Sequence, residues 1–176
     1  IKDKDIKIQA GHCVGGNLED CSGVTHLFNA MKGISHRASS TALSALITDR
    51  LYTEIIADGV HLSDDIIRLI FKSKPINRII LISDALPITY SSKKAAVFAD
   101  EKIYYDGIKA TSANGTIAGS TTLLDRIIKI LAKKDLFSVQ LINNVYDYHN
   151  LELDGEIEWD DEFNIVHVRK GDYFAK

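Results

Sequence analysis

The sequence predicts an α/β protein with a parallel β-sheet, and three observations lead to this fold class. Strand-like and helix-like runs alternate over residues 6–84 in the order strand, crossover, strand, helix, strand, helix, strand. Residues 78–83 are almost purely aliphatic, which is typical of a parallel strand covered on both faces. Several runs also end in a polar residue, as do strands that carry ligand-binding groups at their carboxyl ends.

The first two predicted strands are joined by an unusually short connection. Residues 6–10 alternate between apolar and polar side chains and end at Gly11 and His12, and residues 24–28 form the second predicted strand. The intervening residues 13–23 contain three glycines and little helical periodicity. A parallel crossover normally takes about a dozen residues or more and usually a helix, so we expect a loop here.

The next units follow a regular strand and helix pattern. A helix is predicted over residues 40–47, with Ser39, Ser40 or Thr41 as its N-cap, and a strand over residues 52–57. A second helix is expected to begin after a cap at Ser63 and to end before Pro75. The strand over residues 78–83 then completes the pattern.

The rest of the chain is predicted to add smaller elements. We expect the main domain to span residues 1–148 and a short C-terminal β segment to span residues 149–176. The predicted elements are a hairpin insertion over 95–99 and 102–105 with a turn at 106–107, helices over 121–133 and 138–145, and a strand over 163–168.

Composition and charge exclude several classes of partner. The formal net charge is −3 and no run of Lys or Arg is interleaved with aromatic residues, so nucleic acid is not an expected ligand. No apolar stretch approaches the roughly 20 residues needed to cross a bilayer, so we expect a cytoplasmic protein that does not enter membranes. Cys13 and Cys21 are expected to be free thiols, as is usual in the cytosol.

Four predicted strands end in residues that bind metals or transfer protons: His12, His26, His61 and Asp84. Imidazoles and a carboxylate on neighbouring strand ends could hold a divalent metal, which activates a bound water and polarises a carbonyl oxygen. This arrangement predicts metal-assisted hydrolysis. Each residue also has a structural alternative, because a single histidine can be a hydrogen-bonded structural group and an aspartate can form a turn. We expect the other histidines to lie at the surface: His36, His149 and His167.

Five segments occur in an order and spacing that is specific to one protein family. They are AGH at residues 10–12, THLFNAM at 25–31, ADGVH at 57–61, SDA at 83–85 and GTIAGS at 115–120. In these segments the chain resembles the N-acetylglucosamine-6-phosphate deacetylases of the amidohydrolase superfamily. The resemblance extends over residues 6–128. It implies the C-terminal half of a (β/α)8 TIM-type barrel, with a hairpin insertion and a reduced C-terminal β segment.

The resemblance also implies the catalytic roles. His12 and His26 match two metal ligands, and the implied cofactor is a divalent metal ion, with zinc or iron expected. Asp84 matches the carboxylate that takes a proton from the metal-bound water and returns it to the leaving amine. His61 matches a histidine that hydrogen-bonds the sugar or stabilises the developing oxyanion.

Further positions match the family's substrate contacts. Arg37 matches an arginine that binds the substrate phosphate and that family members can supply across a dimer interface, so a homodimer is expected. A guanidinium in a serine-rich loop could also be only a solvated charge. The other implied substrate-binding residues are Asn29 and Ala30, then Asp58, Gly59, Val60 and His61, and finally Ile117, Ala118 and Gly119 in a loop that closes over the sugar.

The resemblance covers only half of the family's barrel. A (β/α)8 barrel needs about 250 residues, and the family's third protein ligand, a glutamate, belongs to the N-terminal half. We therefore expect that half to act as a partner. It could be a separate or cleaved chain, it could lie outside the present sequence, or it could be missing from a truncated relative. Residue 1 is Ile rather than Met, which favours the first two explanations.

The predicted function is metal-dependent deacetylation of N-acetylglucosamine 6-phosphate once the barrel is complete. One alternative is an inactive fragment that binds a phosphosugar or acts as an interaction module. A second alternative is an amidohydrolase that acts on a different amide. Arg37 and His61 distinguish the second alternative, because a substrate without phosphate would not need them.

Overall fold

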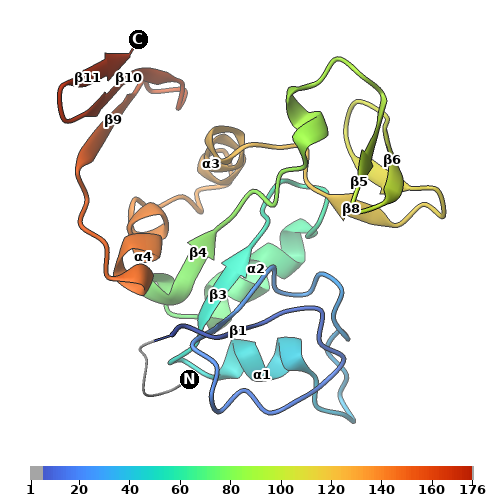
Figure 1. The fold of residues 1–176 in the computed structure, drawn as a ribbon. Coiled ribbons are helices and arrows are strands. Elements are labelled where there is room, and N and C mark those ends of the chain that lie inside the picture. The colour runs from blue at the N-terminus through green and yellow to red at the C-terminus, as the bar shows by residue number, and fades with distance from the viewer. Residues whose placement is uncertain (1–5, 176) are drawn as a thin grey trace.

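The structure, a computed structural model, describes residues 6–175 and is centred on a four-stranded parallel sheet (Figure 1). Its strands are β1 (Gln9–Ala10), β2 (Gly23–Val24), β3 (Tyr52–Ile55) and β4 (Ile79–Leu81), and they lie side by side in the order of the chain. Each neighbouring pair is parallel. The predicted α/β class with a parallel sheet is therefore confirmed.

Two helices connect the later strands and begin at predicted caps. Helix α1 (Thr41–Ile47) starts after Ser40, whose hydroxyl accepts a hydrogen bond from the backbone N–H of Leu43 at 3.2 Å. Helix α2 (Asp64–Ser73) starts after Ser63, whose hydroxyl caps its first turn in the same way. These hydroxyls satisfy backbone donors that a first helical turn leaves unpaired. Both predicted helices are confirmed.

One face of the parallel sheet builds the hydrophobic core. Alternate residues of a strand point to the same face, and on this face they join the helices in one buried cluster. Each fully buried aliphatic side chain of this kind contributes about 1.5–3 kcal/mol of transfer free energy. The cluster includes Val24, Ile55 and Ile79 from the strands, with Ala42 and Ile67 from the helices.

The opposite face of the sheet carries a polar network. Glu54 of β3 accepts one hydrogen bond from the side-chain amide of Gln9, at 2.6 Å, and another from the hydroxyl of Thr25. Its neighbours Thr53 and Ile55 are fully buried. Since successive side chains of a strand alternate between faces, Glu54 leaves the sheet on the side away from the core.

A four-stranded antiparallel sheet follows β4 (Figure 1). Strands β5 (Ala95–Phe98) and β6 (Glu101–Tyr105) form the predicted hairpin, which is confirmed. Strands β7 (Ala110–Ser112) and β8 (Ile117–Gly119) extend it. Residues 115–120 are therefore more than a turn before a helix, because they contain β8. The short 3-10 helix η3 (Pro87–Tyr90) joins β4 to this sheet.

The two later helices differ from their predicted bounds. Helix α3 (Leu124–Ala132) starts three residues after the predicted residue 121, because the hydroxyl of Thr121 donates to the carbonyl of Ile108 instead of capping the helix. Helix α4 (Gln140–His149) runs past the predicted end at residue 145. It packs against β4 and the 3-10 helix η2 (Ile76–Arg78).

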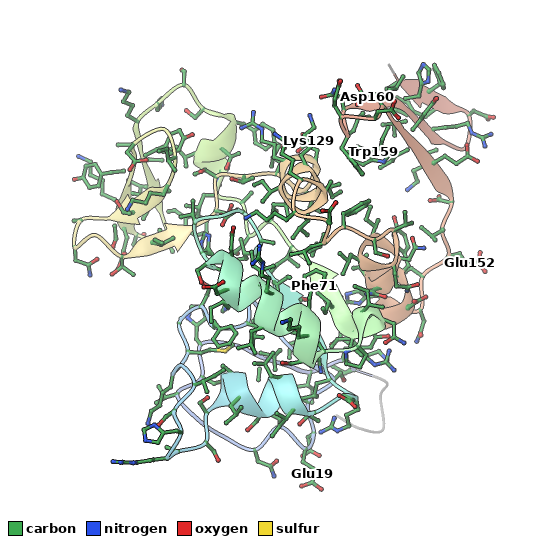
Figure 2. The ribbon with its side chains drawn as sticks, turned by 180° about the vertical axis from the view of Figure 1, so that it is seen from behind. Glu19, Phe71, Lys129, Glu152, Trp159 and Asp160 are labelled. Atoms are coloured by element: carbon green, nitrogen blue, oxygen red, sulfur yellow. The ribbon has the colours of Figure 1, made fainter. Side chains whose placement is uncertain are left out.

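The C-terminal residues form a third sheet, on the other side of α3 from the β5–β8 sheet (Figure 1). Its strands are β9 (Gly155–Trp159), β10 (Ile165–Lys170) and β11 (Tyr173–Ala175), all antiparallel. Figure 2 shows Lys129 of α3 beside Trp159 and Asp160. The ammonium of Lys129 donates to the side chain of Asn164, which itself bonds to Asp160. The turn between β9 and β10, which contains Asp160 and Asn164, thereby links the third sheet to α3.

Four of the strands predicted over residues 6–84 are too long, and those predicted over 52–57 and 78–83 end at Ile55 and Leu81. The predicted strand over 24–28 is wrong beyond Val24, because His26 and Phe28 have φ angles of 31° and 75°. These left-handed conformations cannot continue a strand. Strand β1 likewise includes only the last two of the predicted residues 6–10.

Two smaller predictions concern cysteines and membranes. Cys13 and Cys21 are both free thiols, as predicted. Among residues 6–175, no helix is long and apolar enough to span a membrane.

Candidate active site

The residues that the sequence singles out lie beyond the carboxyl ends of the parallel strands. His12 lies two residues after β1, His26 two residues after β2, and Asp84 three residues after β4. Parallel strands share one direction, so these ends lie along one edge of the sheet. The rings of His12 and His26 have centroids 4.8 Å apart. The structure therefore brings the two predicted metal ligands together.

The backbone turns sharply at each of these residues. The φ angles are 52° at His12, 31° at His26 and 49° at Asp84, all in the left-handed region. For a residue with a Cβ atom this conformation costs about 1 kcal/mol, and such residues cluster at functional sites. Ala30 of the predicted substrate contacts also has a left-handed backbone, with φ at 52°.

The histidine pair has properties that fit a divalent metal ion. The Nδ1 atom of His26 is buried and has no hydrogen-bond partner, which is costly for a polar atom that does not bind anything. Two imidazoles on one tetrahedral zinc ion, with Zn–N bonds of about 2.0–2.1 Å, have ring centres about 5 Å apart. Within the described part of the chain no third His, Cys, Asp or Glu completes a metal-binding group. His12 and His26 would thus supply two of the three protein ligands usual in catalytic zinc sites.

His61 is held by a buried aspartate in the loop after β3. Its Nδ1 atom lies 2.8 Å from Oδ2 of Asp58, and the two side chains are only 6% and 2% exposed. The other carboxylate oxygen of Asp58 accepts the backbone N–H groups of Val60 and His61, both at 2.9 Å. Gly59, with a φ of 80°, allows the chain to turn around the carboxylate.

Hydrogen bonds lower the pKa of Asp58. Burial raises the pKa of this carboxyl group, but the hydrogen bonds from the His61 ring and from the backbone N–H groups of His61 and Val60 outweigh it. The pKa of Asp58 falls from its usual value of 3.8 to about 2. Asp58 is therefore a carboxylate at neutral pH.

Ser120 joins this loop to the end of β4. Its hydroxyl donates to Oδ2 of Asp58 at 2.9 Å and accepts from the backbone N–H of Thr122 at 3.0 Å. Its backbone N–H donates to the carbonyl of Asp84 at 3.0 Å, and its carbonyl accepts from Leu86 at 2.9 Å. Sequence reasoning did not single out Ser120, although it is the last residue of the GTIAGS segment. No local pattern reveals a partner 62 residues away.

The Asp84 carboxylate is available for chemistry. Asp84 is exposed, and no hydrogen bond or ion pair of its side chain occurs within residues 6–175. An exposed carboxylate without a protein partner can accept and return a proton. Asp84 shares its edge of the sheet with the histidine pair, but it is not part of a three-residue metal-binding group.

The other predicted substrate contacts lie in three separate segments. The side-chain amide of Asn29 donates to the carbonyl of His26 at 3.2 Å, which shapes the turn after the second histidine. Arg37 is exposed in the loop before α1, and its guanidinium forms no hydrogen bond or ion pair within residues 6–175. Ile117 and Ala118 of β8 are exposed as well.

Close packing requires a glycine at position 119, the last residue of β8. A Cβ atom at this position would lie 3.0 Å from Cγ of Leu86 and 3.2 Å from the carbonyl oxygen of Asp84. Only glycine therefore fits without movement of the segment that carries Asp84. This contact keeps the end of β8 close to the end of β4.

Comparison with curated proteins identifies relatives of this chain, although no protein family model matches it. It is 32% identical over 127 residues to N-acetylglucosamine-6-phosphate deacetylase from Bacillus subtilis (strain 168), which covers 68% of this chain and 32% of that protein. It is 25% identical over 136 residues to N-acetylgalactosamine-6-phosphate deacetylase from Escherichia coli O157:H7, covering 73% of this chain and 36% of that protein. The matches thus span about a third of the length of these relatives.

Solved structures share the fold. N-acetylglucosamine-6-phosphate deacetylase from Thermotoga maritima superposes with a TM-score of 0.86 at 23% identity, covering 96% of this chain and 52% of that chain. A variant of the enzyme from Mycobacterium smegmatis, in complex with N-acetyl-D-glucosamine-6-phosphate, superposes with a TM-score of 0.88 at 22% identity, covering 98% and 52%. The chain therefore has the fold of about half of these proteins.

Proposed function

Because this chain is a homologue of the N-acetylglucosamine-6-phosphate deacetylases that spans only part of their length, we propose that it is the C-terminal half of such an enzyme. The proposed reaction hydrolyses the acetamide of N-acetylglucosamine 6-phosphate to acetate and glucosamine 6-phosphate. One observation carries the proposal: the rings of His12 and His26, at the ends of adjacent parallel strands, have centroids 4.8 Å apart, and the Asp84 carboxylate lies on the same edge.

The four parallel strands would be successive strands of a (β/α)8 barrel. The polar network of Gln9, Thr25 and Glu54 supports this assignment, because it lies on the face without helices, where a barrel would have its interior. The N-terminal half of the barrel would then cover this face and supply the third metal ligand. It would act as a partner of this chain, whether joined to it or separate.

His12 and His26 would hold the divalent metal ion, with zinc or iron as the proposed identity. When bound, such an ion supplies a Lewis acid and an activated water. The unpartnered and buried Nδ1 atom of His26 supports this role, since binding a cation would remove the cost of leaving the atom unpaired.

Asp84 would act as the general base and then as the general acid. Its carboxylate takes a proton from the attacking water and returns it to the nitrogen of the leaving amine, so that acetate and a protonated amine result. The exposure of Asp84 and the absence of a protein partner among the described residues support this role. His61 would contact the substrate beside the reacting amide.

The substrate phosphate would bind to Arg37, whose guanidinium suits a phosphate group. Arg37 is exposed in a loop, which is compatible with a phosphate site completed in a homodimer. Asn29, Ala30 and the backbone of the loop formed by Asp58, Gly59 and Val60 would line the sugar, and Ile117, Ala118 and Gly119 would close over it.

N-acetylgalactosamine 6-phosphate is a second candidate substrate. Curated relatives include N-acetylgalactosamine-6-phosphate deacetylases, from Escherichia coli O157:H7 and from Shewanella sp. (strain ANA-3). The two sugars differ only in the configuration of one hydroxyl group, so the same metal, acid–base and phosphate groups would serve both. Comparison of kcat/KM for the two sugars distinguishes the candidates.

Acetate release from N-acetylglucosamine 6-phosphate tests the proposal. The chain is assayed with Zn²⁺ or Fe²⁺, alone and together with the N-terminal half of the Bacillus subtilis relative. We expect release in the combined sample and none after Asp84→Asn, with sugar phosphate binding retained in the variant. Asp125→Asn, in the first turn of α3, is a matched control and should keep full activity.

Two outcomes would contradict the proposal. Unchanged activity in Asp84→Asn would remove Asp84 from the mechanism. Phosphosugar binding without acetate release in the completed enzyme would favour the alternative of an inactive binding module.

A further inference from the structure

Ser120 connects three parts of the proposed site. Its hydroxyl bonds to Asp58, which holds His61, and its backbone bonds to Asp84 and Leu86. It also follows directly after Gly119, the end of the segment proposed to close over the sugar. Ser120 itself is 1% exposed, so its polar atoms are satisfied within the protein.

The Asp58 carboxylate is fully used by groups of the protein. Four donors converge on it: the backbone N–H groups of Val60 and His61, the ring of His61, and the hydroxyl of Ser120. A carboxylate has about four lone-pair sites in its plane, so little capacity remains for a sugar hydroxyl. Asp58 therefore acts on its protein neighbours.

We infer that Asp58 and Ser120 are positioning residues that fix the orientation and tautomer of His61. Because Asp58 accepts from Nδ1, neutral His61 carries its proton there and presents Nε2 as a hydrogen-bond acceptor. This inference rests on the proposed function in one respect, namely that His61 contacts the substrate. His61 would then direct Nε2 toward the substrate.

The geometry predicts the effect of Asp58→Asn. The side-chain oxygen that faces the N–H groups of Val60 and His61 must remain an acceptor, so the new amide nitrogen takes the position of Oδ2. That nitrogen is a donor and faces Nδ1 of His61. The His61 proton must therefore move to Nε2, and His61 loses its acceptor there.

Long-range ¹H–¹⁵N correlation spectra of the histidine rings test the inference in the 176-residue chain without substrate. For the neutral ring, we expect the wild type to show His61 protonated at Nδ1. Asp58→Asn should show it protonated at Nε2. Wild-type protonation at Nε2, or an unchanged tautomer in Asp58→Asn, would overturn the inference.

Ser120→Ala and Thr121→Val separate the role of Ser120 from a general loss of a buried hydroxyl. The Thr121 hydroxyl is also buried, but it donates to the carbonyl of Ile108. We expect Ser120→Ala to keep the Nδ1 tautomer, because Asp58 remains a carboxylate, but to broaden the ring signals of His61 because Asp58 is held less firmly; Thr121→Val should leave these signals unchanged. Equal spectra for the two variants would overturn the role of Ser120.

Activity of the completed enzyme gives a separate readout. Ser120→Ala should lower kcat by about 10- to 100-fold, as is typical for residues that orient a functional group, with KM within about twofold. If the wild type shows no deacetylation but His61 has the expected tautomer, the proposed function fails and the positioning inference stands. If the wild type is active but its His61 carries the proton on Nε2, the positioning inference fails and the proposed function stands.

Discussion

At the scale of single residues, the polar groups of the site are stabilised by bonds that the sequence does not reveal. The sequence identifies four candidate site residues, because each follows an apolar run: His12, His26, His61 and Asp84. The hydrogen bond from Ser120 to Asp58 cannot be predicted from the sequence, because it depends on how two distant strand ends meet. The left-handed backbone at three of these four residues is equally hidden, since none of them is glycine.

The buried carboxylate of Asp58 predicts a specific dependence of stability on pH. Its pKa is lowered from 3.8 to about 2 in the folded chain, so it stabilises the fold above pH 3.8 and this contribution is lost as the pH falls through about 2. The shift corresponds to about 2 kcal/mol. Asp58→Asn should therefore unfold with a free energy about 2 kcal/mol lower at pH 7, measured by urea denaturation.

The difference in unfolding free energy between the wild type and Asp58→Asn should shrink as the pH falls from 4 toward 2. Asp106→Asn is a suitable control: backbone N–H groups also lower the pKa of Asp106, but its side chain is fully exposed, so we expect a much smaller difference from the wild type over this pH range. A difference between wild type and Asp58→Asn that stays constant over this pH range would contradict the assignment.

At the scale of elements, the helices follow the sequence more closely than the strands do. Helix α2 begins at its predicted cap Ser63, and α1 begins at Ser40, one of the three caps that the sequence allows, since capping is a local interaction. Strand lengths depend on pairing with neighbours, and β1 and β2 pair over only two residues each. The apolar residues after β2 are therefore buried in a turn, with Leu27 fully buried.

Lys74, which follows α2, closes the C-terminal end of α1. Its ammonium donates to the carbonyls of Ala45 and Thr48 at 3.2 and 2.7 Å. These carbonyls have no partner inside the helix, and a cation there also interacts favourably with the helix dipole. Lys74 is only 4% exposed, so this bond joins two helices in the interior.

Burial lowers the pKa of Lys74 from 10.5 to about 8, against an opposing effect of Asp49. Because the unfolded chain keeps the proton up to pH 10.5, the folded chain gains stability as the pH rises from 8 to 10.5. The gain approaches about 3 kcal/mol. The free energy of unfolding of the wild type, minus that of Lys74→Met, should rise by this amount across the range. Urea denaturation at several pH values checks this, and a pH-independent difference would contradict it.

At the scale of the whole molecule, the chain has a parallel sheet whose two faces differ, as the proposed half-barrel requires. The parallel sheet packs on helices with one face, while Glu54, Gln9 and Thr25 form a polar network on the other. Strand β1 stands at the edge of the sheet, and an unpaired edge invites a further strand. The sequence predicts the parallel sheet from its alternating strand and helix runs. It does not predict the sizes of the two antiparallel sheets, whose short strands lack long periodic runs.

The central claim is that the strand-end histidines form a metal site, and a calorimetric titration of Zn²⁺ into the chain combined with the N-terminal half of the Bacillus subtilis relative, at pH 7.5, tests it most directly. The account predicts about one bound ion per chain in the wild type. It also predicts loss of that binding in the His12→Ala/His26→Ala double variant and its retention in a His36→Ala/His149→Ala double variant, since those two side chains are exposed. A wild type that binds no zinc, or a His12→Ala/His26→Ala variant that binds as the wild type does, would contradict the claim.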